Sequence, residues 1–467
     1  MSKVINKSCF FIFAITLLVI NFSFNISAQN NNSNNVRKDV DKYYNKNISD
    51  IPALTLTDCI KYSLKNQPAI NQSIIDQYIA ETNNNIAISN WLPQVIGTAN
   101  YTNYFQLPTV FSNTNNGIVS VKSGVFNYSI PQFTISQNIY SPDALFAVKA
   151  AKLNKTASSQ SVLSTKINFI SDVSKAYYDV LLSIQQISVY KEDTARLNKN
   201  QSDAFHRYKS GIVDKVDYKQ ATIALNNSLA KLKTANEILN SKYAILKQFM
   251  AYPANKTFTV EFDTAKMFED IYIDTLAPLQ FENRIEYQQL LTTKLIAGQN
   301  VLYYKMAYLP SVSAFYNYNY EFESNHFSDL YNKPYPYSLF GLQLTIPVFT
   351  GFRRLDNIHK AKLQEQRLDL DIEQMVLGIY TQYVQATSNY KSNLYYFKTQ
   401  KENVEMAKEV YDIVKFQYRE GIKTYLDVIV AESDLQTSEI NYLNALFQVL
   451  SSKIDLKKAM GVLQTDI

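Results

Sequence analysis

The segment "SVSAFYNYNYEFES" (residues 311–324) alternates between two kinds of side chain over its whole length. Odd positions are mostly Ser, Asn and Glu, whereas even positions from 312 to 322 are apolar or aromatic. A two-residue period predicts a β-strand with one apolar and one polar face, here about twice the usual length. The predicted apolar face consists of Val312, Ala314, Tyr316, Tyr318, Tyr320 and Phe322.

The composition favours a well-packed protein and excludes some partners. Of the 467 residues, 46% are hydrophobic, which is enough for a sizeable core. The 46 basic and 41 acidic residues give a net charge of +5. Because the basic residues are scattered singly, we expect no nucleic-acid partner. The chain carries 35 Tyr and 26 Phe against one Trp, far more aromatic surface than a soluble enzyme usually has.

The N-terminus is typical of an export signal. Two lysines precede an apolar run at 9–20, and a cleavage site follows at Ala28, so we expect a signal peptide at 1–28. Cys59 is then the only cysteine of the exported chain, which excludes a disulfide within it. No later segment has the roughly 18 apolar residues of a membrane helix. In a bilayer the chain would therefore have to form a closed barrel.

Two proline-free stretches predict long helices. One lies between Pro142 and Pro253, and the other follows Pro347. Ser141 is the expected N-cap of the first helix, with Pro142 at its first position. A helix from 142 to about 208 would be roughly 100 Å long, which favours a coiled-coil rod over an ordinary globular helix.

Two other windows, 93–142 and 310–347, show period-two alternation and are each long enough for two strands. We expect a β-hairpin in each. The connecting loops are expected at "FSNTNNGIVS" (111–120) and "HFSDLYNKPYPY" (326–337), which are rich in Asn, Ser, Gly or Pro.

The chain contains an internal repeat. "RYKSGIVDKVDYKQA" (207–221) matches "QYREGIKTYLDVIVA" (417–431) at five positions with a constant offset, which indicates a duplicated unit. The expected organisation is an Asn-rich flexible segment at 29–53, a first repeat at 54–253, a connector at 254–280 and a second repeat at 281–467. Each repeat should hold a helix, a β-hairpin (94–140 or 311–350) and a long helical hairpin (142–253 or 352–463).

Two hairpins supply four strands, and a barrel needs about eight at least. Several chains must therefore share one barrel, because unpaired edges in lipid cost several kcal/mol per group. The aromatic face of 311–324 would then meet outer-membrane lipid. The alternative is a strand in a soluble sandwich with an aromatic core.

Four segments resemble the TolC family of outer-membrane efflux proteins. "NQPAI" (66–70) and "NRIEY" (283–287) resemble the segments that open each half of that family. "LTIPVFTG" (344–351) resembles its strand-to-helix junction, and "YREGIKTYLDVIVAESDL" (418–435) resembles its periplasmic tip. The resemblance extends from about Leu54 to Leu463.

This resemblance implies an α+β membrane protein and a homotrimer. Three chains would form a 12-stranded outer-membrane β-barrel that continues as a periplasmic α-helical tunnel. The expected partners are a periplasmic adaptor (membrane fusion) protein and an inner-membrane pump, in tripartite efflux or type I secretion. Drugs, metals and polypeptides all fit the sequence as cargo.

The resemblance also implies a gate at the periplasmic tip. Tyrosine, basic and aspartate residues close the tunnel in that family, and the matching residues here are Tyr418, Lys423, Asp427 and Asp217. Family members have Arg in place of Lys423 and a second Asp in place of Val430, so a cation block at the tip is in question. The turns at Gly211, Ile212, Gly421 and Ile422 would dock the adaptor.

A purely structural interpretation of these tip residues stays open. The glycines would be helix C-caps and the aspartates would be favourable charges at helix N-termini.

No enzyme, cofactor or metal site is expected. The chain has no phosphate loop and no nucleophile elbow, and its carboxylates on helices are expected on solvated faces. The histidines are isolated, at His206, His326 and His359. The rival function is a non-conducting structural or adhesive coiled-coil protein of the envelope. Four long amphipathic strands favour the channel, because a rod needs none.

Overall fold

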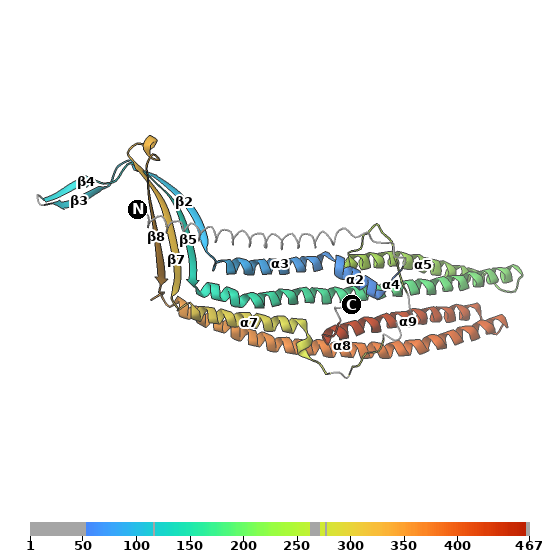
Figure 1. The fold of residues 1–467 in the computed structure, drawn as a ribbon. Helices are drawn as coiled ribbons and strands as arrows, with labels where there is room; N and C mark the ends of the chain where they lie inside the picture. Colours follow the sequence, from blue (N-terminus) through green and yellow to red (C-terminus); the bar gives the residue numbers. More distant parts are fainter. Residues whose placement is uncertain (1–52, 115–116, 262–270, 276–277, 464–467) are drawn as a thin grey trace.

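The computed structural model describes residues 53–114, 117–261, 271–275 and 278–463. The predicted signal peptide, and the Asn-rich segment up to residue 52, lie outside the described residues. The molecule is elongated, with a β-sheet at one end and two helix-to-helix turns at the other (Figure 1). None of the helices in the described ranges is both long and apolar enough to cross a membrane.

The helices occur as two similar sets. In the first set, α4 has 68 residues and so extends roughly 100 Å, and α3 and α5 follow each other along its length (Figure 1). In the second set, α7 and α9 follow α8 in the same way (Figure 1). The bounds are α2 (Leu56–Asn66), α3 (Pro68–Ser89), α4 (Pro142–Lys209) and α5 (Lys215–Met250), then α7 (Ile285–Met306), α8 (Arg353–Arg419) and α9 (Tyr425–Ala459).

The first hairpin is preceded by two helices rather than the single one expected. The break lies at Gln67, whose backbone is extended (φ −66°, ψ 119°) between α2 and α3. Pro68 causes it, because a proline disfavours the helical conformation in the residue before it. The proline then fits the first helical position of α3, where no backbone donor is needed.

Four antiparallel strands form one sheet in the order β2-β5-β7-β8. Their bounds are β2 (Gln94–Asn103), β5 (Asn127–Tyr140), β7 (Ser311–Ser324) and β8 (Pro334–Thr345). The two repeats join at the β5–β7 pair, so β2 and β8 are the edges of the sheet in the described chain. Opposite β7, the ladder of β5 skips Ile130 and Pro131, because proline has no backbone N–H to donate.

The register extends the alternation of β7 across the whole sheet. Tyr316 lies opposite Ile135 of β5 and Phe340 of β8, and Ile135 lies opposite Val95 of β2. Residues directly opposite each other in antiparallel strands share a face. Asn317, by contrast, lies opposite Thr134. The sheet therefore has one continuous apolar face and one mostly polar face.

The prediction of a loop at 111–120 is wrong. Strands β3 (Thr109–Thr114) and β4 (Gly117–Lys122) pair as a second, smaller hairpin that projects beyond the sheet (Figure 1). The Asn and Ser residues suggested a loop, but Val110, Phe111 and Val119 favour strands. The loop expected at 326–337 also ends early, because β8 begins at Pro334.

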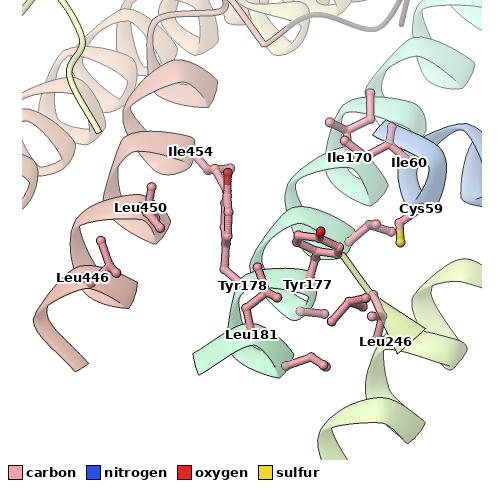
Figure 2. Close-up of a cluster of buried hydrophobic side chains, with 14 of the residues drawn as sticks. Cys59, Ile60, Ile170, Tyr177, Tyr178, Leu181, Leu246, Leu446, Leu450 and Ile454 are labelled. Carbon is pink, nitrogen blue, oxygen red and sulfur yellow. The ribbon is translucent and has the colours of Figure 1, made fainter. Parts of the chain in front are cut away.

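The main core lies halfway along the helices, where the two sets meet. Two adjacent tyrosines of α4 contact opposite sides of it: Tyr177 lies beside Cys59 and Leu246 of the first repeat, whereas Tyr178 points to Ile454 of α9 (Figure 2). Both rings are almost fully buried. A single turn of α4 thus packs against both repeats.

The segment 254–280 does more than connect the repeats. Its strand β6 (Thr259–Val260) pairs with β1 (Ala53–Leu54), and Phe258, Val260 and Ile271 are buried in the core. The hydroxyl of Tyr177 donates to the carbonyl oxygen of Glu261 at 2.6 Å. This packing was not predicted, because the segment shows no regular periodicity.

The segments "NQPAI" and "NRIEY" hold equivalent positions in the two repeats. Gln67 Nε2 donates to the carbonyl oxygens of Gln248 (3.1 Å) and Phe249 (2.9 Å) at the end of α5. Arg284 Nη1 donates to the carbonyl oxygen of Ala459 (3.1 Å) at the end of α9. The last carbonyls of a helix lack partners within it. Each segment therefore caps the returning helix of its own repeat.

Candidate functional site

Two tight turns form the end of the molecule opposite the sheet, one between α4 and α5 and one between α8 and α9 (Figure 1). Gly211 (φ 69°) and Gly421 (φ 77°) adopt the left-handed conformation that other residues rarely accept. The amide of Ile212 donates to the carbonyl of Arg207, and that of Ile422 to Gln417, both at 2.9 Å. These bonds define Schellman caps.

Both isoleucines of these turns are exposed, Ile212 by 64% and Ile422 by 71%. The hydrogen bonds of the turns use only backbone atoms, so the isoleucine side chains are not needed to close them. The tip thus presents two apolar side chains at equivalent places of the two repeats. Nothing in the turn itself explains them.

Asp427 begins α9. Its Oδ2 accepts a hydrogen bond from the amide of Thr424 at 2.9 Å, and Thr424 Oγ1 accepts one from the amide of Asp427 at 3.3 Å. The two residues form a capping box. The bond to Thr424 holds the pKa of Asp427 below its usual value, with help from Lys423, whose Nζ lies 3.8 Å from Oδ1. Within one chain, Lys423 and Asp427 therefore pair with each other.

Tyr418 lies between the two helical hairpins. The guanidinium of Arg207 in α4 sits 4.9 Å from its ring centre, and the ring of Tyr425 in α9 lies 5.6 Å away. Burial raises the pKa of Tyr418, Arg207 opposes this, and the charge of Asp217 adds to it. Asp217 thus acts electrostatically on Tyr418, whereas Lys423 and Asp427 form a separate pair.

The sequence interpretation missed Arg207 and Tyr425. Both lie at positions where the repeats differ, since the other repeat has Gln417 and Lys215 there. The gate residues were assigned from the resemblance to the TolC family, which gave no role to Arg207 or Tyr425. The contact between the hairpins was therefore not expected from the sequence.

A buried polar network lies farther up the same hairpins. Arg196 Nε of α4 donates to Glu432 Oε1 of α9 at 3.2 Å, and Asn200 Nδ2 donates to Glu432 Oε2 at 3.0 Å. Asp193 Oδ1 lies 3.6 Å from Arg196 Nη2, and its Oδ2 accepts a hydrogen bond from Ser228 of α5 at 2.6 Å. The network connects helices of both repeats.

The expectation that helix carboxylates lie on solvated faces is wrong for Asp193 and Glu432, each only 2% exposed. Burial raises the pKa of Glu432 to about 7, and repulsion from Asp193 adds to this rise. The charge of Arg196 works in the opposite direction. Glu432 therefore changes its charge near neutral pH.

Within the described ranges, no group of three or more His, Cys, Asp or Glu side chains is arranged to hold a metal ion. Cys59 is fully buried, and burial raises the pKa of its thiol to about 12, so it is not a reactive thiolate. The distinctive chemistry of the described chain is the set of charged and aromatic contacts between its helical hairpins.

Comparison with known proteins agrees with this architecture. The family model for the outer membrane efflux protein matches residues 59–251 and 297–462. The chain is similar to the outer membrane protein TolC of Vibrio cholerae, with 20% identity over 70% of this chain and 75% of that protein. It is also similar to the outer membrane efflux protein BepC of Brucella suis, with 22% identity over 88% of this chain and 86% of that protein.

A solved structure shares the fold. The outer membrane protein VceC of Vibrio cholerae superposes with a TM-score of 0.69 at 16% identity, covering 87% of this chain and 96% of that one. Identity this low speaks for the fold alone. The resemblance noticed in the sequence is confirmed by the family match, which covers more than half of the chain.

Proposed function

The chain belongs to the outer membrane efflux protein family, and on this premise we propose that three copies form a channel through the outer membrane that continues as a periplasmic tunnel. Cargo would be delivered by an inner-membrane pump through a periplasmic adaptor and would pass along the tunnel without further energy input. Efflux and type I secretion use the same design, and the pump would choose the cargo.

The observation that carries the proposal is that both flanks of the chain are open. In the described residues, β2 pairs only with β5 and β8 only with β7. Four strands cannot close on themselves, and free edges are not tolerated in lipid. Pairing β8 of one copy with β2 of the next would close a barrel, and three copies would give the proposed 12 strands.

The helices under these two edges are open in the same way. Leucine or valine recurs every seven residues on α8, and these side chains are 41% to 68% exposed. The helix α3 lies on the opposite flank (Figure 1), and three of its isoleucines are exposed. Leu363 lies about 15 Å along α8 from its start, and Ile79 lies about 15 Å along α3 from its end. These are the helix ends nearest the sheet, so the two side chains lie at a similar level. The two sets are Leu363, Leu370, Leu377 and Val384 on α8, and Ile75, Ile79 and Ile86 on α3.

The two faces of the sheet support a pore rather than the non-conducting rod. The apolar face, with Tyr316, Tyr318 and Phe322, would meet lipid, as tyrosines suit the interface between lipid and water. The opposite face carries Asn317 and Thr134 and would line water. A structural or adhesive coiled coil has no use for a sheet that separates polar from apolar side chains in this way.

The tip would hold the gate. Tyr418, Lys423, Asp427 and Asp217 would meet across the three copies at the narrow end. Lys423 and Asp427 are partly exposed, so each contact of this kind contributes about 1 kcal/mol or less. Binding of an adaptor to the exposed isoleucines of the tip turns would be enough to open it.

Planar-bilayer conductance tests the proposal. The wild type should show a small conductance that rises strongly in Asp217→Ala/Asp427→Ala. The matched control is Glu237→Ala/Glu282→Ala, which removes two exposed carboxylates away from the tip and outside α3 and α8, and it should change little. Conductance that the tip variant leaves unchanged removes the gate but keeps the channel. Inserted protein without any current favours the structural rival.

A further inference from the structure

A hollow of about 340 Å³ lies just above the tip turns, between α4, α8 and α9. Its buried floor includes Tyr425 and Val428, and its half-buried walls include Arg207 and Lys415. Exposed Asp203 and Arg419 stand at its mouth. The hollow therefore has an opening to solvent and a closed, largely apolar end.

The lining is cationic. Arg207, Lys415 and Arg419 face it, and among the described residues Asp203 is the one carboxylate that does. No carboxylate of the described chain lies within 4 Å of the side-chain nitrogens of these three cations. Arg207 stacks on a tyrosine ring, and Lys415 Nζ donates to the hydroxyl of Tyr411 at 2.9 Å. Their charges are therefore not neutralised by direct ion pairs.

The floor supplies an unused donor. Tyr425 is 2% exposed, and its hydroxyl has no hydrogen-bond partner in the described part of the chain. A buried hydroxyl without a partner has lost its hydrogen bonds to water without replacement, so such groups are rare in folded proteins. Burial raises the pKa of Tyr425, which keeps its proton in place. The Tyr425 hydroxyl and the three cations are all hydrogen-bond donors. A negatively charged acceptor in the hollow would therefore satisfy all of them.

The nearest acidic side chains do not fill this role. Both carboxylate oxygens of Glu432 already accept hydrogen bonds, from Arg196 and Asn200. Burial also favours the neutral form of Glu432, with a pKa raised to about 7. Asp217 lies on α5, which contributes no residue to the lining. The positive character of the hollow therefore remains.

We propose that this hollow binds an oxyanion, a carboxylate or phosphate group, held by Arg207, Lys415 and Arg419 with the hydroxyl of Tyr425 donating from the floor. Hydrogen bonds from charged donors to oxyanions are the stronger kind, and arginine suits them by its planar fork. Because α4 belongs to the first repeat and α8 and α9 to the second, the bound anion connects the two helical hairpins. The source is either a free anion or an acidic side chain of a protein docked on the tip.

The site is tested by calorimetry on the purified full-length protein with inorganic phosphate, at an ionic strength held constant with chloride. Lys415→Gln/Arg419→Gln should lower the affinity at least tenfold, and Tyr425→Phe should lower it several-fold. The control is Lys209→Gln, which removes an exposed tip cation that does not line the hollow and should leave the affinity unchanged.

Saturable binding that the double variant leaves unchanged overturns the proposal, as does the absence of saturable binding in the wild type. Tyr425→Phe keeps the buried ring, so it separates loss of the donor from loss of the fold. The test needs no current, so a failure here leaves the proposed channel standing.

A second experiment, by the same calorimetry, distinguishes the two sources of the oxyanion. A capped peptide with a single glutamate is added in competition with phosphate, beside its glutamine counterpart. Displacement of phosphate by the glutamate peptide alone assigns the site to a docked acidic side chain. Phosphate that neither peptide displaces assigns it to a free anion, and both results support the oxyanion site.

Discussion

The contact between α4 and α9 should weaken as the pH rises through 7. Glu432 is buried, and its pKa is raised from 4.5 to about 7 in the folded chain. A raised pKa means that folding favours the protonated acid. The resulting stabilisation is complete below about pH 4.5 and is lost as the pH rises through 7.

The size of the effect follows from this shift. A difference of one pKa unit corresponds to about 1.4 kcal/mol, so the whole shift is worth about 3 kcal/mol. Opening of the hairpins would expose Glu432 to water and return its pKa to the ordinary value. Between pH 5.5 and pH 8.5, the free energy of local opening should therefore fall by about 2 kcal/mol.

Native-state hydrogen exchange of the amides near Glu432 in α9 measures this free energy, once corrected for the intrinsic pH dependence of exchange. Glu432→Gln mimics the protonated acid and should remove most of the pH dependence while keeping the hydrogen bond from Asn200. An opening free energy that is flat in the wild type, or that rises with pH, would falsify this account of Glu432.

Three further outcomes are expected. If the proposed trimer forms, Leu370→Glu should shift it to monomer in size-exclusion chromatography with light scattering, because Leu370 is 65% exposed in the single chain and its change leaves the chain's own core intact. Gly421→Ala should lower the unfolding free energy of the α8–α9 hairpin by about 1 kcal/mol, since alanine resists the left-handed conformation, and unchanged stability would contradict the assigned cap. Arg284→Met should cost about 2–3 kcal/mol and raise exchange at the end of α9, because the carbonyl of Ala459 loses its donor; equal exchange would show that the cap is not needed.

Periodicity predicted the fold well where one signal dominates. Proline-free runs gave both long helices, and the alternation at 311–324 gave β7, because burial of one face imposes its period on the sequence. The β3–β4 hairpin was missed because its strands are short and lie among Asn and Ser residues. Strand propensity and turn propensity compete in such segments, and local composition does not decide between them.

The site was predicted less completely, for a physical reason. Tyr418 and Asp217 were assigned to the tip from the resemblance to the TolC family, and the charge of Asp217 does act on Tyr418, whereas their role in a gate stays a prediction. The capping role of Asp427 agrees with the structural interpretation left open by the sequence, and its role in a gate stays a prediction. Arg196 and Glu432 come from different repeats, and no periodicity within one helix shows which carboxylate will be buried against another helix.

The pairing of β5 with β7 also sets an order of folding. Each helical hairpin joins segments that are neighbours in the chain. Phe133 of β5, by contrast, pairs with Tyr318 of β7, which lies far away in the sequence. Contacts between near neighbours form faster than contacts between distant ones, because less chain entropy is lost in closing the loop. The helices, and the strand pairs within each repeat, should therefore form while β5 and β7 still lack each other. During this interval the alternating aromatic segments are exposed and prone to aggregation, so escort by a chaperone would protect the newly made chain.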